Sequence, residues 1–381
     1  MRKLLIAHLF LIVATVSTYA FTLKGVVVDQ LTNKGIENVS LFLDGTTIGT
    51  LSKADGSFSL LIPDNSKPSL IVNYLGYERQ LFAISQSQAN QLLNILLISK
   101  AINLNAVSVS AKDPHRADNL AIFQSGLFGN SKAGSKCKIL NPEVLSFSRK
   151  NSNTDNLTVY AYAEKPLIIE NKELGYQISY ALEGFTKSAS ALSFMGHPFY
   201  IDLYSDQMVP SKILLAREKA YRGSTVHFFR SLYANRLKEE GFEVYEIHIT
   251  PDPEGVTYSS NLMRNLIFTR SENTSMVQTE IPLNLNSSTK RTPEYGLLSN
   301  NNPFEIRYTL ESEEINYRSN SSYFGSMKRM IKQQTTLIRL VNNTLKFFSD
   351  GSLENPSHMM TIGYWSFRKL GENLPLNYVP A

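Results

Sequence analysis

The chain has a single cysteine, Cys137, in 381 residues, so it can form neither an intramolecular disulfide nor a cysteine-based metal cluster. It has 38 basic and 33 acidic residues without a basic block of five or more, which argues against a dedicated nucleic-acid-binding protein. After residue 20, no run approaches the roughly 18 apolar residues of a membrane span. The sequence therefore predicts no transmembrane helix in the mature chain.

The usual catalytic and cofactor motifs are also missing. No HExxH, GxSxG, Walker or GxGxxG pattern is present, and the six histidines lie far apart in the sequence. We therefore expect no resident cofactor and no metal site, and the sequence leans against an enzyme without excluding one. Two carboxylates from distant segments could still converge as a glycosidase pair. Cys137 stands between Lys136 and Lys138, but an inert thiol is the favoured interpretation.

The first twenty residues have the layout of a secretory signal peptide. Arg2 and Lys3 form a charged start, an apolar stretch follows, and small residues precede a cleavage point after Ala20. The apolar stretch is shorter than the roughly 20 residues that a spanning helix needs. We expect residues 1–20 to be removed on export, which places the mature protein in the periplasm, in the outer membrane or at the cell surface. Part of the net charge of +5 then belongs to the leader.

Residues 21–100 are predicted to form a seven-stranded antiparallel β-sandwich. Short apolar runs alternate with turn residues at a spacing of about 8–12, and Asp44-Gly45 and Asp55-Gly56 are typical of hairpins. The expected strands are residues 21–29, 38–43, 46–51, 58–62, 70–74, 77–84 and 92–98. Phe58 is assigned to the core, and Gly45, Gly56 and Gly76 to turns that need a positive φ.

The same region resembles a known family. The segments Gly25-Val26-Val27-Val28-Asp29, Asp55-Gly56-Ser57-Phe58 and Leu75-Gly76-Tyr77-Glu78 are similar to the carboxypeptidase regulatory-like domain. This resemblance implies a transthyretin-like, carbohydrate-binding-like sandwich that is an accessory domain and not a peptidase. The domain also stands at the N-terminus of TonB-dependent outer-membrane transporters. Tyr77 is a candidate for stacking on a sugar, although packing inside the sandwich is the favoured interpretation.

A linker at residues 101–118, with one expected strand at 106–110, leads to a second domain at 119–381. This domain is predicted to be β-rich α+β with one long helical segment, residues 211–240, broken at Gly223. The expected strands are residues 157–163, 166–170, 175–184, 199–204, 243–250, 277–282, 305–310, 336–341 and 344–348. Residues 271–303 and 316–326, rich in polar side chains, are interpreted as long surface loops. The fold class is therefore mainly β.

The helical segment contains the strongest candidate binding residues. On a helical wheel, Arg222 falls within the apolar arc, Arg230 borders it, and His227 projects to the polar side. A buried guanidinium must be paired, so these residues could form an anion pocket. The alternative is structural: the arginines pair with Glu218, Glu240 or strand carboxylates.

Three functions remain open from the sequence. The first is an exported, non-catalytic envelope protein that binds a glycan, a peptide or an outer-membrane partner. The second is a hydrolase of peptide or glycan with its site in the C-terminal domain. The third is an assembly component of a TonB-dependent transport system.

Overall fold

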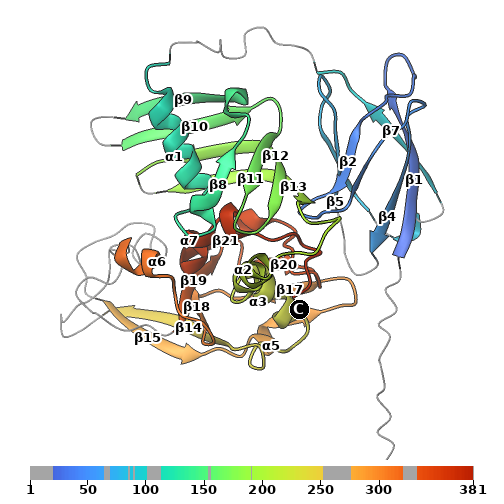
Figure 1. Ribbon diagram of the computed structural model, residues 1–381. Coiled ribbons are helices and arrows are strands. Elements are labelled where there is room, and N and C mark those ends of the chain that lie inside the picture. Colours follow the sequence, from blue (N-terminus) through green and yellow to red (C-terminus); the bar gives the residue numbers. More distant parts are fainter. Residues whose placement is uncertain are drawn as a thin grey trace, which may run out of the picture.

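The computed structural model describes residues 20–63, 69–84, 86–88, 91–100, 113–152, 156–189, 191–251, 276–320 and 333–380. Strands dominate, as the sequence predicts, and those that are described form five sheets. A sandwich made by the N-terminal residues stands beside two further parts, one above the other in Figure 1. The expected strand at 106–110 lies outside the described residues.

The N-terminal part has seven described strands in two sheets. They are β1 (Ala20–Asp29), β2 (Ser40–Leu43), β3 (Gly49–Leu51), β4 (Ser57–Pro63), β5 (Ser69–Asn73), β6 (Gln80–Ala83) and β7 (Leu92–Leu97), with the short helix η1 (Gln86–Gln88). The orders β4-β1-β7 and β3-β2-β5-β6 enclose a shared apolar core that includes Phe58. Neither sheet holds all seven strands, and β7 runs parallel to β1, so the prediction of a wholly antiparallel sandwich is wrong. The chain changes sheets between β6 and β7, and this crossover permits the parallel pairing.

Two glycine turns connect the sandwich strands in different ways. Gly45, with φ +72°, closes the predicted hairpin between the antiparallel strands β2 and β3. Gly56, with φ +81°, leads instead from β3 in one sheet to β4 in the other, so the second hairpin prediction is wrong. Asp55 Oδ1 accepts a hydrogen bond from Ser57 N at 2.9 Å, which stabilises this crossover turn. A Cβ atom on Gly56 would lie 2.3 Å from the Val27 carbonyl oxygen, so only glycine fits there.

Residues 113–202 form a six-stranded sheet covered by a helix. The elements are α1 (Arg116–Phe128), η2 (Gly134–Lys136), β8 (Cys137–Ile139), η3 (Pro142–Val144), β9 (Leu145–Ser152), β10 (Asn156–Ala163), β11 (Leu167–Asn171), β12 (Tyr176–Lys187) and β13 (Leu192–Asp202). The order is β8-β11-β12-β10-β9, with β13 also paired to β12. The α1 side chain Phe123 packs on Phe185 with 4.8 Å between ring centroids. This helix begins inside the segment predicted as a linker.

The remaining described residues form a second layer with its own apolar core, while two of them, Ala220 and Leu370, pack into the core of the six-stranded part. Its elements are α2 (Ser211–Tyr221), α3 (Thr225–Tyr233), β14 (Phe242–Pro251), β15 (Met276–Pro282), α5 (Leu285–Ser288), β16 (Thr289–Arg291), β17 (Gly296–Ser299), β18 (Phe304–Tyr308), α6 (Ile315–Asn320), β19 (Gln334–Leu340), β20 (Thr344–Phe347), η5 (Pro356–His358), β21 (Met359–Gly363), α7 (Tyr364–Arg368) and η6 (Leu370–Glu372). The sheets have the orders β15-β14-β18-β19-β21 and β16-β17-β20. The predicted loop at 271–303 is wrong in its described part, which contains β15, α5, β16 and β17.

Helices α2 and α3 replace the single long helix. Gly223, with φ +65°, ends one and turns the chain into the other, so the predicted break is confirmed. A Cβ atom at Gly223 would lie 2.3 Å from Gln334 Oε1, and the tight approach excludes a side chain. Ser224 caps α3 by accepting a hydrogen bond from His227 N. The second helix stops at Tyr233, before the expected end at residue 240.

The sandwich is joined to the rest of the chain at a surface that we call the sandwich joint, made by residues 44–49, 197–200 and 375–378. The β2–β3 hairpin bonds to both neighbours: Gly45 N donates to Pro198 O (2.9 Å), Tyr200 N to Thr46 O (2.9 Å) and Leu376 N to Gly45 O (2.7 Å). Asn377 Nδ2 also donates to Thr47 Oγ1 at 2.7 Å.

One histidine lies at the centre of this joint. His197 is 9% exposed, its Nδ1 lies 2.7 Å from Asp44 Oδ2 of the sandwich, and its Nε2 lies 2.9 Å from Glu183 Oε1 of β12. Arg79 Nη1 lies 3.8 Å from the same Glu183 oxygen. The joint therefore combines backbone hydrogen bonds with a charged cluster that spans both parts.

Candidate functional site

Tyr77, the predicted binding residue of the sandwich, is engaged by its own neighbours. Its hydroxyl donates a hydrogen bond to Asp29 Oδ2 at 2.8 Å, and its ring centroid lies 5.7 Å from that of Tyr74. The hydrogen bond to Asp29 raises the pKa of the Tyr77 phenol. Packing accounts for both the ring and the hydroxyl, and sugar binding by Tyr77 stays a prediction.

The two candidate arginines have different partners. Arg222 is half exposed at the end of α2, and its Nη2 pairs with Glu218 Oε1 at 2.5 Å. Because α2 ends there, Arg222 does not continue the apolar arc, and that part of the wheel prediction is wrong. Arg230 donates from Nε, Nη1 and Nη2 to the carbonyl oxygens of Asp350, Tyr378 and Leu376 at 2.9, 2.9 and 2.6 Å. It therefore holds the C-terminal segment of the sandwich joint against α3.

His227 is buried, so the prediction that it projects to the polar side is wrong. Its ring centroid lies 4.8 Å from that of Tyr221 and 4.9 Å from that of Phe242. Its Nδ1 accepts a hydrogen bond from Gly223 N at 3.1 Å, and its Nε2 faces Glu240 Oε2 at 3.3 Å. Burial lowers the pKa of His227, which favours the neutral ring with its proton on Nε2. Rings from outside α3 cover this side of the helix, so a helical wheel drawn from the α3 sequence cannot predict that His227 is buried.

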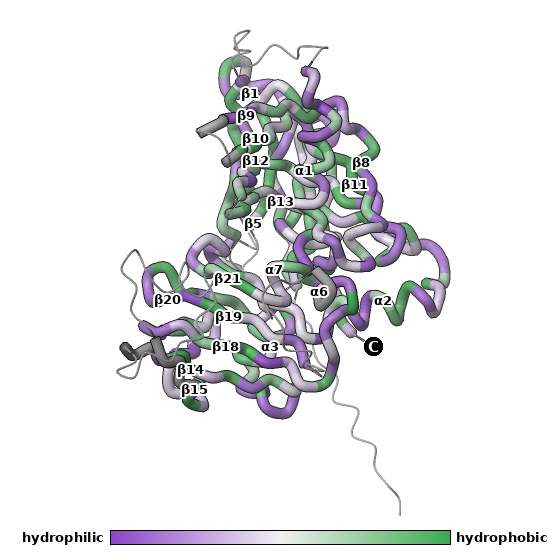
Figure 2. The backbone as a smooth tube through the Cα atoms, turned by 90° about the vertical axis from the view of Figure 1, so that its left-hand side faces the viewer, coloured by the Kyte–Doolittle hydropathy of each residue, from purple (hydrophilic) through white to green (hydrophobic). Residues whose placement is uncertain are grey.

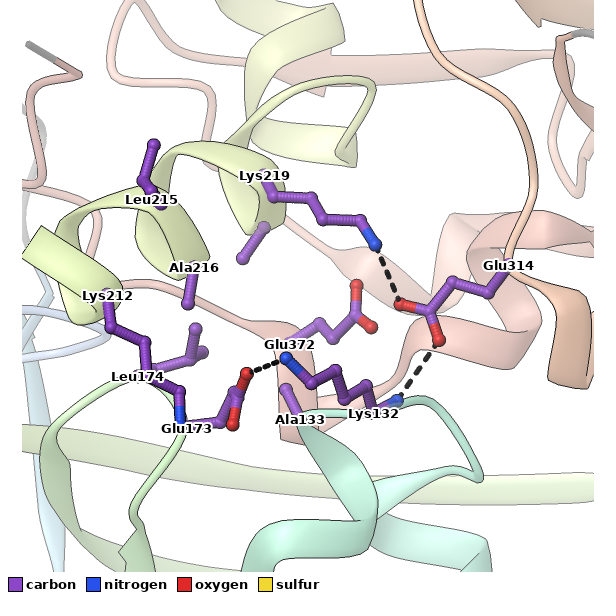
Figure 3. Close-up of a pocket in the computed structure, with 11 residues that line it drawn as sticks. Lys132, Ala133, Glu173, Leu174, Lys212, Leu215, Ala216, Lys219, Glu314 and Glu372 are labelled. Carbon is purple, nitrogen blue, oxygen red and sulfur yellow. Dashed lines mark hydrogen bonds and ion pairs between the residues drawn. The ribbon is translucent and has the colours of Figure 1, made fainter.

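A groove of about 460 Å³ lies elsewhere, along one side of α2, and none of these four residues lines it. We call it the α2 groove (Figure 3). Its helical wall consists of Lys212, Leu215, Ala216, Lys219 and Ala220. These residues recur at three- and four-residue intervals, so they share one face of the helix. Figure 2 shows α2 at the edge of the molecule, with hydrophobic and hydrophilic residues alternating along it.

The opposite wall comes from segments far apart in the sequence. The turn after α1 contributes Lys132 and Ala133, and the β11–β12 turn contributes Glu173 and Leu174. Glu314 directly precedes α6, and Glu372 ends η6. The first two segments belong to the six-stranded part and the last two to the second layer. The α2 groove therefore lies where these two parts meet.

Charges of both signs line the groove, and one of them is unpaired. Lys132 Nζ pairs with Glu173, and Lys132 N donates to Glu314 Oε2 at 3.1 Å. Lys219 Nζ lies 3.7 Å from Glu314 Oε1. Lys212, exposed in the first turn of α2, forms no ion pair with any residue that the structure describes. It is thus the cationic lining residue that is available to a ligand.

A buried arginine fixes the carboxylate at the floor of the groove. Arg368 Nε donates to Glu372 Oε2 at 2.5 Å, and the two residues are only 5% and 8% exposed. The other guanidinium nitrogens donate to the carbonyl oxygens of Arg222, Lys219 and Ala220. These carbonyls end α2, so Arg368 also satisfies its C-terminus.

Glu314 and Glu372 form an unfavourable pair of like charges. Burial raises the pKa of Glu314, and the charge of Glu372 raises it further. A carboxyl in this setting either takes up a proton or binds a cation, because each relieves the repulsion. The groove can therefore offer one carboxylate, one shared proton site and an apolar wall to a bound molecule.

Metal binding, cysteine chemistry and a membrane-spanning helix find less support in the described residues. Among them, no group of three or more His, Cys, Asp or Glu side chains is placed to hold a metal ion. Burial raises the pKa of Cys137 to about 12, so it is a thiol and a poor nucleophile at neutral pH. No helix in the described part of the chain is long and apolar enough to span a membrane.

The sequence held a signal for one wall of the groove only. The run Lys212, Leu215, Ala216 and Lys219 is a stripe of mixed character on a helix, visible at a spacing of three and four residues. A wheel centred on α3 does not show it. The remaining lining residues come together only through the tertiary fold.

Comparison with known proteins agrees with the sandwich. Residues 23–109 match the family model of the CarboxypepD_reg-like domain. No curated protein matches the chain. The match confirms the resemblance drawn from the glycine turns, and it extends nine residues beyond the expected end at residue 100. Residues 23–109 are therefore a CarboxypepD_reg-like domain, and it is followed by a β-rich region to which no family is assigned.

Proposed function

We propose that this chain is an exported protein of the cell envelope that binds a peptide in the α2 groove without acting on it chemically. The CarboxypepD_reg-like domain is of the kind found in envelope proteins, and the leader pattern at residues 1–20 favours export. The observation that carries the binding proposal is the groove itself, in which Leu215 and Ala216 of α2 are bordered by Lys212, which has no ion pair among the described residues, and by the two neighbouring carboxyls Glu314 and Glu372.

The lining favours a peptide over a glycan. Sugar sites generally use aromatic rings as stacking surfaces, and none of the residues that line the α2 groove is aromatic. A peptide offers apolar side chains for Leu174 and Leu215 and charged groups for the lysines and glutamates. The sandwich then serves as the accessory domain, docked through the sandwich joint.

Native mass spectrometry of the mature protein with a pool of short peptides tests the binding proposal. We expect complexes with wild type and weaker complexes with Leu215→Ser, because Leu215 lines the groove and is 66% exposed. Leu214→Ser is the matched control, since this neighbour is 44% exposed and does not line the groove. Binding on a glycan array without any peptide binding would overturn the proposal.

Export and partnership need an experiment in cells. Fractionation with crosslinking should place the mature chain in the envelope, with its N-terminus at or near Phe21. Retention of residues 1–20 in a cytosolic fraction would contradict export. Specific crosslinks to a TonB-dependent transporter would favour the assembly function over peptide binding.

A peptide hydrolase is the second candidate function, because the Glu314 carboxyl with its raised pKa faces the groove beside Glu372. A carboxyl with a raised pKa can act as a general acid. Incubation of the peptide pool with wild type and with Glu314→Gln distinguishes the two functions. Intact peptides in both samples support binding alone, and cleavage by wild type only supports the hydrolase.

A further inference from the structure

The length of the α2 groove limits the ligand. Its helical wall runs from Lys212 to Ala220, a rise of about 12 Å at 1.5 Å per residue. An extended chain advances about 3.3 Å per residue, so three to four residues span the wall. On the proposed function, in which the groove holds a peptide, the ligand is therefore about three to four residues long.

The charges are also arranged along that length. Lys212, the cation without an ion pair in the described structure, stands in the first turn of α2. Lys219 and Ala220, at the other end of the helical wall, adjoin Glu314 and the Arg368-bound Glu372. Figure 3 shows Lys212 on one side of the cavity and Glu314 on the other. The groove therefore has Lys212 at one end, where the nearby carboxylate Glu173 is already paired with Lys132, and two carboxyls, Glu314 and Glu372, at the other end. We call these the positive end and the negative end.

Glu314 is the less closely paired of the two carboxyls at the negative end. Glu314 is reached by the Lys132 backbone N–H and, at 3.7 Å, by the Lys219 ammonium. The guanidinium of Arg368 is taken up by Glu372 and by the backbone carbonyls of α2. Burial raises the pKa of Glu314, and the Glu372 carboxylate raises it further. A ligand ammonium placed beside the two carboxyls would offset the repulsion between them.

We propose that the α2 groove binds a short free peptide of about three residues by its two ends, with the terminal carboxylate at Lys212 and the terminal ammonium at Glu314 and Glu372. The middle side chain then lies against Leu215 and Ala216. Recognition of both ends selects products of peptide breakdown over internal segments of intact proteins.

Isothermal titration calorimetry with the tripeptide Ala-Leu-Ala tests this inference. N-acetylation of the peptide should weaken binding at least about tenfold, and C-terminal amidation should do the same, because each removes one charge-assisted contact. Lys212→Gln should lose the discrimination against the amide, and Glu314→Gln the discrimination against the acetylated peptide. Lys165→Gln and Glu143→Gln, exposed and away from the groove, are the matched controls.

The outcomes separate this inference from the proposed function. Equal binding of the free and both blocked peptides would overturn end recognition and leave peptide binding intact. Absence of binding by all three tripeptides and also by longer peptides would overturn both proposals. Thermal melting of each variant confirms that it folds, and Lys212→Gln alters only an exposed residue, so its result stands even if Glu314→Gln is destabilised.

Discussion

Replacement of His197 by glutamine should loosen the sandwich joint at mildly acidic pH and change it little at alkaline pH. The imidazole contacts Asp44 Oδ2 at 2.7 Å and Glu183 Oε1 at 2.9 Å, and these carboxylates come from the two parts that meet there. Only the doubly protonated ring can donate to both. When it loses a proton, one ring nitrogen presents a lone pair to a carboxylate.

The sign of the pH dependence follows from the surroundings of the ring. Burial alone lowers the pKa of His197, but the hydrogen bonds and charges of Asp44 and Glu183 outweigh burial and hold the pKa above its ordinary value of 6.5. The stability that the charged ring contributes is therefore fully present below the unfolded-state pKa and is lost as pH rises through the folded-state pKa. Arg79 stays charged beside Glu183 and partly balances the carboxylates at high pH.

The magnitude can be bounded from the geometry. A hydrogen bond to a charged group contributes about 1.5–3 kcal/mol. The Asp44 and Glu183 side chains are 30% and 35% exposed, so water screens both interactions. Glutamine also keeps an N–H group that can donate a hydrogen bond to one of the two carboxylates, so only part of the interaction is lost. We expect His197→Gln to lower the free energy of unfolding by about 2 kcal/mol near pH 6, and by much less near pH 8.5.

Urea unfolding at both pH values measures this difference, and hydrogen exchange locates it. Exchange should accelerate in the hairpin around Gly45, whose amide donates to Pro198 O across the joint. His115→Gln is the control, because this side chain is 55% exposed and lies outside the joint. If His197→Gln were equally destabilised at both pH values, or if exchange at the hairpin did not change, the charged ring would not be what holds the joint.

Three further predictions concern single side chains. Arg368→Met should lower the free energy of unfolding by about 3–5 kcal/mol in denaturant titrations, because it leaves Glu372 buried without its partner. Arg368→Lys should recover only part of this stability, because a lysine cannot donate both to Glu372 and to the carbonyl groups of α2. A wild-type unfolding midpoint for either variant would contradict this prediction. Arg230→Gln should make the C-terminal segment easier to digest with carboxypeptidase, because the three hydrogen bonds from the Arg230 guanidinium to backbone carbonyls are lost. Unchanged digestion kinetics would show that Arg230 does not hold this segment in place. Cys137, with a pKa of about 12, should resist iodoacetamide at pH 8 in the folded protein and react in urea, and fast labelling without urea would show a thiolate.

Local chemistry explains why the sandwich could be predicted. Gly45 and Gly56 stand where the backbone needs a positive φ, and Asp55 stabilises its own turn, so the strand positions follow from neighbouring residues. The pairing of β1 with β7 is different, because it depends on a change of sheet that no local signal marks. Turn residues thus predict where strands end better than they predict which strands meet.

The helical segment shows where a periodicity argument fails. Gly223 was a visible break, but the wheel treated the residues on both sides as one helix. Arg222 lies beyond the end of α2, and His227 is covered by rings from α2 and β14 that the pattern within α3 cannot show. The α2 groove could not be predicted for the same reason, since its lining residues come from two parts of the fold and from segments far apart in the sequence.

The sandwich joint also constrains the order of folding. Asn377 and Thr47 are 330 residues apart, so their contact closes a very large loop. The entropy of closing so large a loop is recovered only when most of the other contacts already exist. The contacts between the β2–β3 hairpin and residues 376–377 therefore depend on the rest of the fold bringing these two distant segments together.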